Sequence, residues 1–226
     1  MSATIVFDVN ETLLDLTGLQ ANFQRLFGDE TARREWFTLL LQLALVVTIT
    51  DTYRDFKTLA GEALEVVAGR RRVELDDQAT SSILGGIAHL PPHPEVPAAL
   101  DRLGAAGFRL AALTNSPPAT AQAQLTNAGL IDRFDLVMSV DATRHFKPHP
   151  APYRMAAEQL GVEPADLWMV AAHDWDVAGA MQVGFRGAFI ARPGQGYAHG
   201  YPAPDLSEAD LMEVAEALIG RFGLEG

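Results

Sequence analysis

The sequence predicts an α/β fold in which a Rossmann-like parallel sheet core carries an inserted helical cap domain. Two features of the 226-residue chain support this prediction. Strand-like and helix-like segments alternate after residue 100, which is typical of a parallel sheet with helices on both faces. One strand-like segment lies instead at the start of the chain, and a helical stretch separates it from the others. We therefore expect residues 1–15 and 92–226 to form the core and residues 16–91 to form the cap.

The first strand is expected at 4–7, where a short run of β-branched and aromatic residues is followed at once by Asp8. Apolar residues then recur at spacings of three and four, the period of an α-helix. The helices that this period predicts cover residues 19–27, 36–49, 56–68 and 75–90. Four prolines between residues 91 and 97 indicate the boundary at which the chain returns to the core.

Beyond the prolines, apolar segments of strand length alternate with helical patterns that end at glycine. The predicted strands are 108–113, 134–138, 167–171 and 187–190. The predicted helices are 118–129, 150–160 and 176–183, followed by a last helix that begins near Ser207. Ser207 is chosen as its start because Asp210 follows at the spacing of a capping box.

Composition excludes several classes of function. Lys and Arg total 17 against 29 Asp and Glu, so the net charge of −12 disfavours nucleic acid and anionic membranes as partners. The chain has no cysteine, which excludes disulfides and thiolate chemistry and fits a cytoplasmic location. The most apolar run, residues 36–49, is too short to span a bilayer. We expect it to be buried in the fold or at a subunit contact, which leaves a homodimer open.

Polar residues follow four of the predicted strands, where a parallel sheet binds its ligands. The four segments are Asp8–Leu13, Thr114–Ser116, Lys147–Pro148 and His173–Asp176. Together they bring two carboxylates, a hydroxyl and an ammonium to one crevice, a set suited to covalent catalysis. A carboxylate nucleophile needs a neighbouring cation to stay ionised, and Lys147 is the candidate.

These segments, in this order, resemble the haloacid dehalogenase superfamily. The strings FDVNETLLD, LTNS, KP and HDWDVAGA carry the resemblance, and AGL-x₃-FD-x₂-MSVD with KP-x₄-Y is similar to the L-2-haloacid dehalogenase branch. The resemblance implies a hydrolase that removes halide from small 2-haloacids through an aspartyl ester, without a cofactor. Its expected partner is a small-molecule haloacid, and a homodimer is possible.

The resemblance also implies roles for individual residues. Asp8 would attack the carbon that carries the halogen, Thr12 would donate a hydrogen bond near it, and Lys147 would keep it ionised. Asp176 and His173 would lie beside the water that hydrolyses the ester. The expected substrate-binding residues are Asn10, Phe37, Leu41, Phe56, Thr114, Asn115, Tyr153 and Trp175, with Tyr153 also orienting Lys147.

Two alternative functions stay open. A Mg²⁺-dependent phosphatase of the same superfamily needs a general acid two residues after the nucleophile, where this chain has Asn10. It also needs an acidic metal ligand four residues before Asp176, where this chain has Ala172, so we expect no metal site. The second alternative is a ligand-binding protein that has lost turnover.

The chain departs from the branch at three places. Phe37 stands where the branch usually has an arginine, and only Arg33 and Arg34, one helical turn earlier, offer a replacement. His173 stands where the branch usually has asparagine. Glu11 follows Asn10 where the branch usually has Tyr-Gly, and we expect its carboxylate to point away from Asp8, since a negative charge nearby would raise the pKa of the nucleophile.

Overall fold

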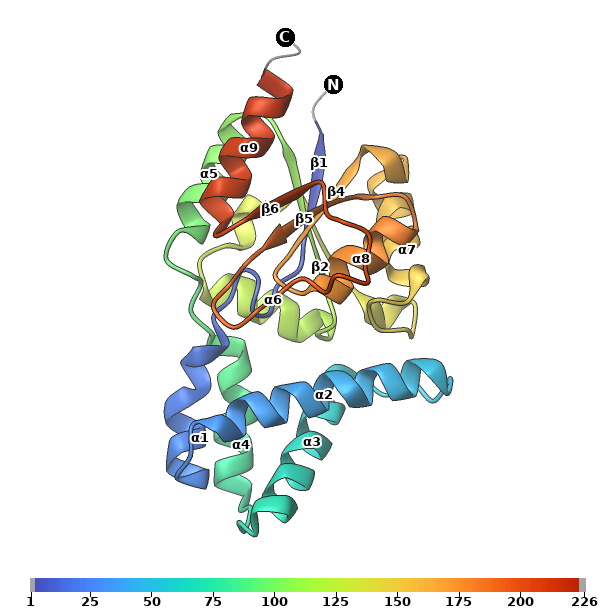
Figure 1. Cartoon of the computed structure of the whole chain (residues 1–226). Coiled ribbons are helices and arrows are strands. Elements are labelled where there is room, and N and C mark those ends of the chain that lie inside the picture. The colour runs from blue at the N-terminus through green and yellow to red at the C-terminus, as the bar shows by residue number, and fades with distance from the viewer. Residues whose placement is uncertain (1–2, 224–226) are drawn as a thin grey trace.

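The computed structural model describes residues 3–223 and contains one six-stranded sheet in which every strand pairs in parallel with its neighbours. The strand order is β3-β2-β1-β4-β5-β6, so the N-terminal strand lies inside the sheet (Figure 1). The strands are β1 Thr4–Phe7, β2 Arg109–Thr114, β3 Leu136–Ser139, β4 Leu167–Ala171, β5 Arg186–Ile190 and β6 Leu206–Glu208. The predicted fold class is confirmed.

Core helices cover the sheet, and cap helices lie together beyond the C-terminal ends of its strands (Figure 1). The cap helices are α1 Gln20–Phe27, α2 Thr31–Ile49, α3 Phe56–Arg71 and α4 Asp77–Gly86. The core helices are α5 Val96–Ala105, α6 Pro118–Asn127, α7 Pro150–Leu160, α8 Asp174–Gln182 and α9 Leu211–Gly223. The exact domain boundaries predicted at residues 15/16 and 91/92 stay a prediction.

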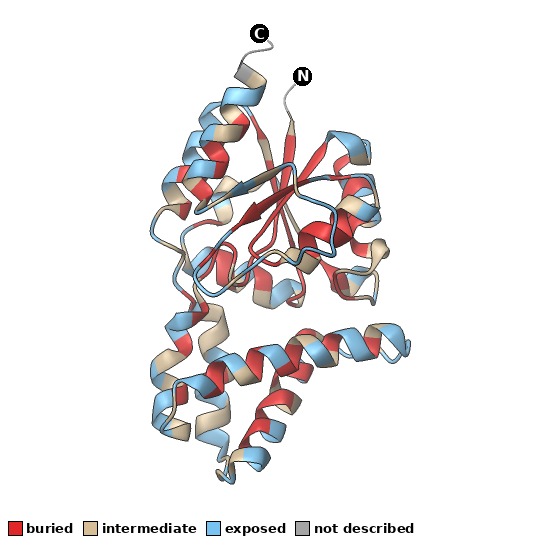
Figure 2. Ribbon diagram, viewed as in Figure 1, coloured by how far each residue is buried: buried red, intermediate tan, exposed pale blue. Residues whose placement is uncertain are grey.

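Burial explains why the strands are short apolar runs. Every residue of β1 and β4 is buried, because helices cover both faces of a parallel sheet. Figure 2 shows the same pattern, with buried residues in the sheet and on the inward faces of the helices. The end of β1 is therefore a place where a carboxylate such as Asp8 is desolvated.

Local signals explain the ends of the cap helices. Asp55 accepts a hydrogen bond from Thr58 N at the start of α3, and Asp76 accepts one from Ala79 N at the start of α4. Within the cap, the indole of Trp36 donates to the carbonyl of Ala60, which ties α2 to α3. The cap thus presents a fixed face of α2 to the core.

The structure differs from the sequence predictions at three helices. Ser207 lies in β6, and the last helix begins at Leu211, because Asp210 itself caps the helix through Glu213 N. Helix α5, which has Pro97 in its first turn, follows a proline-rich boundary and was not predicted. Helix α2 also begins earlier than expected, since Asp29 accepts from Thr31 N. None of the helices within residues 3–223 combines the length and apolar character needed to cross a membrane.

Candidate active site

The carboxylate of Asp8 is the centre of the site at the C-terminal end of β1. Its Oδ1 accepts from Lys147 Nζ at 2.8 Å, and its Oδ2 accepts from Thr12 Oγ1 at 2.7 Å. The Nδ1 atom of His173 lies 3.2 Å from the same Oδ2. Burial by itself would raise the pKa of Asp8, but Lys147 and His173 outweigh burial and hold that pKa well below its ordinary value. Asp8 is therefore an ionised carboxylate only 5% exposed to solvent.

Lys147 is a buried cation shared by two carboxylates. Its Nζ donates to Asp8 and, at 2.6 Å, to Asp176 Oδ2, and its third hydrogen bond goes to the Leu113 carbonyl at 2.8 Å. Burial would lower the pKa of Lys147, yet the two carboxylates raise it above its ordinary value. All three donors of the ammonium are thus used, which fixes Lys147 between Asp8 and Asp176.

Asp176, at the start of α8, is the second carboxylate of the site. Its Oδ1 accepts from the hydroxyl of Tyr153 at 2.6 Å, and burial raises its pKa above the ordinary value. Tyr153 was expected to orient Lys147. The structure instead gives its hydroxyl to Asp176, so Tyr153 acts on Lys147 through that carboxylate.

His173 lies between two carboxylates and two aromatic rings. Its Nδ1 faces Asp8, and its Nε2 lies 3.0 Å from Glu11 Oε2. Glu11, expected to turn away from Asp8, is on the far side of the imidazole. Burial would lower the pKa of His173, but its hydrogen bonds to Asp8 and Glu11 raise it to about 10. The ring stacks on Trp175 with centroids 4.9 Å apart and on Phe37 with centroids 6.3 Å apart.

Comparisons with known proteins identify a family that fits this arrangement. The family model of haloacid dehalogenase-like hydrolases matches residues 3–184. The chain is 34% identical to the (S)-2-haloacid dehalogenase of Xanthobacter autotrophicus over 86% of this chain and 77% of that protein.

The chain belongs to the haloacid dehalogenase-like hydrolases.

Other proteins of the family align with this chain over nearly its full length. The (S)-2-haloacid dehalogenase of Pseudomonas sp. strain YL is 29% identical over 94% of this chain and 92% of that protein. Among solved structures, the Xanthobacter autotrophicus L-2-haloacid dehalogenase with chloropropionic acid covalently bound superposes with a TM-score of 0.91. That structure is 29% identical and covers 97% of this chain and 99% of its own. The resemblance stated from the sequence is confirmed.

Three of the residues expected to bind the substrate instead make hydrogen bonds within the loops around this site. Asn115 Oδ1 accepts from the backbone N of Lys147 at 3.1 Å and so supports the lysine. Thr114, expected among the substrate-binding residues, accepts a hydrogen bond at its Oγ1 from Ser116 N at 3.1 Å. The amide of Asn10 is held by Ser116 Oγ at 3.2 Å and by Gln124 at 2.8 Å. These groups brace the loops around Asp8.

A cavity of about 510 Å³ lies beside His173 between the cap and the core. Of the predicted residues, it is lined by Phe37, Leu41, His173 and Trp175. Its other charged or polar lining residues are Glu11, Asp15, Thr17, Arg33, Arg34, Thr38, His93, Asp174, Arg192 and Gln195. Asp8 is not among the lining residues of this cavity, but His173, which lines it, lies 3.2 Å from Asp8 Oδ2.

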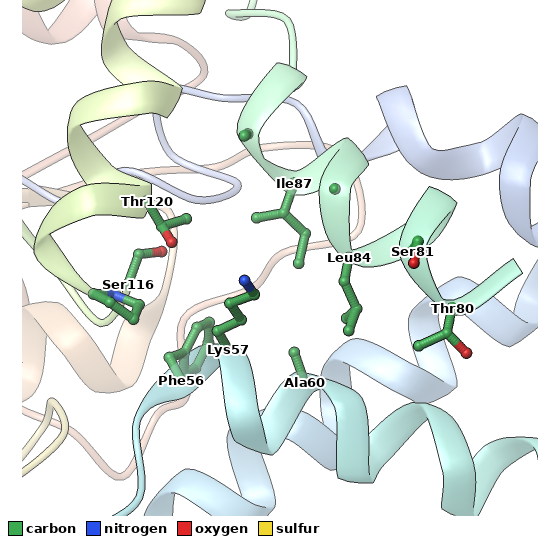
Figure 3. A pocket seen from close by; sticks show the side chains of 12 residues that line it. Phe56, Lys57, Ala60, Thr80, Ser81, Leu84, Ile87, Ser116 and Thr120 are labelled. Carbon is green, nitrogen blue, oxygen red and sulfur yellow. The ribbon is translucent and has the colours of Figure 1, made fainter. Parts of the chain in front are cut away.

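Phe56 lies elsewhere, in a second cavity of about 360 Å³ at the other side of the cap. Figure 3 shows Phe56 and Lys57 of α3 facing Ser116 and Thr120 of the core. The sequence grouped Phe56 with Leu41 and Trp175 as walls of one substrate cavity, and that grouping was wrong. Phe56 lies on α3 and Leu41 on α2, and the spacing of residues along the chain does not reveal where two helices meet the core.

Two functional candidates were missed from the sequence. Arg192 follows β5, a strand end that the sequence analysis did not consider. It is buried, donates to the Thr12 carbonyl at 2.8 Å and pairs with Glu95 at 2.6 Å. Glu11 was predicted only to point away from Asp8, with no role of its own. The sequence feature that could have indicated a role is that Asn10-Glu11 replaces the usual Tyr-Gly beside the nucleophile.

The carboxylates around Asp8 do not make a metal site. Within residues 3–223, no group of three or more His, Asp or Glu side chains could hold a metal ion. Asp176 is bonded to Lys147, and Asp174 accepts from the backbone N of Trp175 and Ala198. The donor set that Mg²⁺ prefers, several free oxygens around one point, does not fit these residues.

Proposed function

We propose that the chain hydrolyses the carbon–halogen bond of small (S)-2-haloacids through an ester on Asp8. The observation that carries the proposal is a buried carboxylate that Lys147 and Thr12 hold ionised beside a cap–core cavity. The relatives named (S)-2-haloacid dehalogenase and the related structure with a covalently bound acid support the same chemistry. The enzyme is a hydrolase of this family.

In the first step, an oxygen of Asp8 attacks the carbon that bears the halogen. A new carbon–oxygen bond forms, and the electron pair of the carbon–halogen bond leaves with the halide. No proton is needed on the leaving group, which fits an amide rather than an acid at Asn10. Lys147, bonded to Oδ1, keeps the attacking carboxylate charged in a site that excludes water.

In the second step, water attacks the ester carbonyl of Asp8. The 2-hydroxyacid leaves, and Asp8 keeps one oxygen from the water. Asp176 takes one proton of the water, because Asp8 is esterified and burial raises the pKa of Asp176, and the water's other proton passes to the oxygen of the departing 2-hydroxyacid. His173 was expected to share this role, but both its ring nitrogens face carboxylates and neither offers a free lone pair.

The direct test compares Asp8→Asn with the matched surface variant Asp132→Asn in assays of chloride release from (S)-2-chloropropionate. An amide is a far poorer nucleophile, so Asp8→Asn should lose at least about three powers of ten in turnover, while Asp132→Asn keeps it. Mass spectrometry excludes deamidation. Full turnover in Asp8→Asn would overturn the proposal.

The phosphatase alternative is tested on the same protein. With the donor set described above, we expect chelation by EDTA to leave halide release unchanged. We expect no hydrolysis of p-nitrophenyl phosphate when Mg²⁺ is added. Phosphate release that depends on Mg²⁺ would favour the phosphatase, and haloacid binding without product would favour a ligand-binding protein. Independence from any cofactor and a cytoplasmic location stay predictions.

We also propose that the chain forms a homodimer through the outer end of α2. Apolar side chains are exposed there and on α3, with Ile49 81% exposed. The others are Leu45, Val46 and Val66. Light scattering should give a dimer for the natural chain and a monomer for Ile49→Asp. A monomeric natural chain would contradict the proposal.

A further inference from the structure

His173 carries a positive charge by geometry alone. A carboxylate has no hydrogen to give, so each ring nitrogen that faces one must donate. Nδ1 faces Asp8 Oδ2 at 3.2 Å, and Nε2 faces Glu11 Oε2 at 3.0 Å. The ring is therefore an imidazolium with two fixed N–H directions. The ring also stacks on Phe37 and on Trp175, which limits the space in which it can turn.

Glu11 is built to hold this imidazolium. Its backbone φ is 62°, in the left-handed region that a side chain other than glycine, asparagine or aspartate adopts only when the surroundings require it. Its N–H donates to the Leu14 carbonyl at 2.8 Å, which fixes the turn. Its Oε2 also accepts from Gln195 Nε2 at 3.1 Å. The carboxylate is thus held from two sides at the wall of the 510 Å³ cavity.

The position of His173 decides which part of a haloacid it can reach. In a displacement, the halide leaves on the side opposite the attacking oxygen. The carboxylate of a 2-haloacid is attached to the attacked carbon and so lies to one side of the line of attack. A donor at 3.2 Å from an Asp8 oxygen can therefore meet the substrate carboxylate, whereas the departing halide lies beyond its reach.

We propose that His173 is the receptor for the substrate carboxylate and that Glu11 is the positioning residue that keeps it charged and aimed. In the resting enzyme, the Nδ1–H of His173 is occupied by Asp8. When substrate binds, its carboxylate takes this hydrogen bond, while Nε2 stays on Glu11. Asp8 then loses one of its three donors and becomes a better nucleophile. The proposal deepens, and rests on, the proposed dehalogenase function.

Other charges face the same ring and act on its protonation. From the core, Asp8 and Glu11 favour the imidazolium, and the pKa of about 10 agrees with the charge that the geometry requires. From α2 of the cap, Arg33 and Arg34 line the same cavity as His173. The remaining titratable groups of the cavity are Asp15, His93, Asp174 and Arg192. Removing the Glu11 charge should lower the pKa of His173, because the hydrogen bond and the charge of Glu11 both raise it against burial.

The test measures binding of an unreactive carboxylate, propionate, against neutral propionamide. Calorimetry compares the natural enzyme with Glu11→Gln, His173→Asn and the exposed control Glu158→Gln. At about pH 9, Glu11→Gln should bind propionate at least about tenfold more weakly, and at about pH 6 most of the loss should be regained. His173→Asn should lose the affinity at both pH values. Propionamide binding and the control should not change.

NMR of the His173 ring gives a readout that a merely structural role would not move. We expect its pKa to fall by about two units in Glu11→Gln, the fall that a tenfold loss of affinity at pH 9 requires, and to stay unchanged in Glu158→Gln. An unchanged pKa, or an unchanged preference for propionate over propionamide, overturns the proposal.

Kinetics on (S)-2-chloropropionate separate this proposal from the dehalogenase function. If halide is released, Glu11→Gln should raise KM about tenfold or more at about pH 9, where its ring is mostly neutral, and leave kcat within a few-fold. If the natural enzyme releases no halide, the proposed function fails, and the propionate result still decides whether His173 binds carboxylates.

Discussion

Replacing Lys147 with methionine removes the cation between two buried carboxylates. Lys147 Nζ lies 2.8 Å from Asp8 and 2.6 Å from Asp176, and its side chain is fully buried. Breaking a buried pair in this way costs about 3–5 kcal/mol, because a charge is left without a partner. For a chain of this length, such a loss lowers Tm by roughly 6–20 °C. We expect Lys147→Met to show this loss at neutral pH.

The loss should depend on pH with a definite sign. In the natural protein, the pKa of Asp8 is lowered, so its contribution to stability is present above the unfolded pKa of about 4 and lost below it. Without Lys147, Asp8 and Asp176 repel each other, and one of the two pKa values rises above the unfolded value. The free energy of unfolding of the variant then falls by up to about 1.4 kcal/mol per pH unit as pH rises above about 4.

Thermal melts at about pH 4 and about pH 7 measure both effects. The chain's other lysine, Lys57, is exposed on α3, and Lys57→Met is the matched control. Its Tm should change little at either pH, since surface substitutions usually stay within about 0.5 kcal/mol. An equal loss of Tm in Lys147→Met at both pH values would refute the electrostatic reasoning and leave only lost packing.

Two further predictions concern the ring stack. Because the folded pKa of His173 is raised to about 10, its contribution to stability is complete below the unfolded pKa of about 6.5 and is lost as pH rises through 10. Denaturant unfolding should therefore show that the free energies of unfolding of the natural protein and of His173→Asn converge as pH rises from about 6.5 to 10. A difference that stays constant over this range would contradict a charged ring. Phe37→Arg places a second cation against this ring, so we expect Tm to fall by several degrees and chloride release not to rise. A tenfold faster release at unchanged Tm would show that the missing family arginine, rather than His173, limits the reaction.

The sheet core could be predicted because each strand is a short local run. Thr4–Phe7 and Leu167–Ala171 are recognisable as buried strands without tertiary information, and the parallel order then brings Asp8 and Asp176 to one edge. Ser207 misled the prediction because a serine before an acidic residue fits a helix cap and an edge strand equally well. The local sequence does not show which of these two structures is the more stable one.

The wall of the site could not be predicted, because it depends on contacts between distant segments. Glu11 reaches His173 only through a left-handed backbone at Glu11, which no local pattern required. Phe56 and Leu41 lie on different cap helices, and their cavities differ because α2 and α3 meet the core at separate places. The sequence therefore predicted that Asp8, Lys147 and Asp176 lie together, but it did not predict which residues line each cavity.

A single turnover in water enriched in oxygen-18 tests the central claim most directly. The enzyme in excess is mixed with (S)-2-chloropropionate, and the peptide that contains Asp8 and the released hydroxyacid are both weighed by mass spectrometry. The ester route predicts one heavy oxygen in the Asp8 carboxylate and none in the hydroxyl of the first product. A heavy oxygen in that hydroxyl with an unlabelled Asp8 would mean that water attacks the substrate directly and would contradict the account.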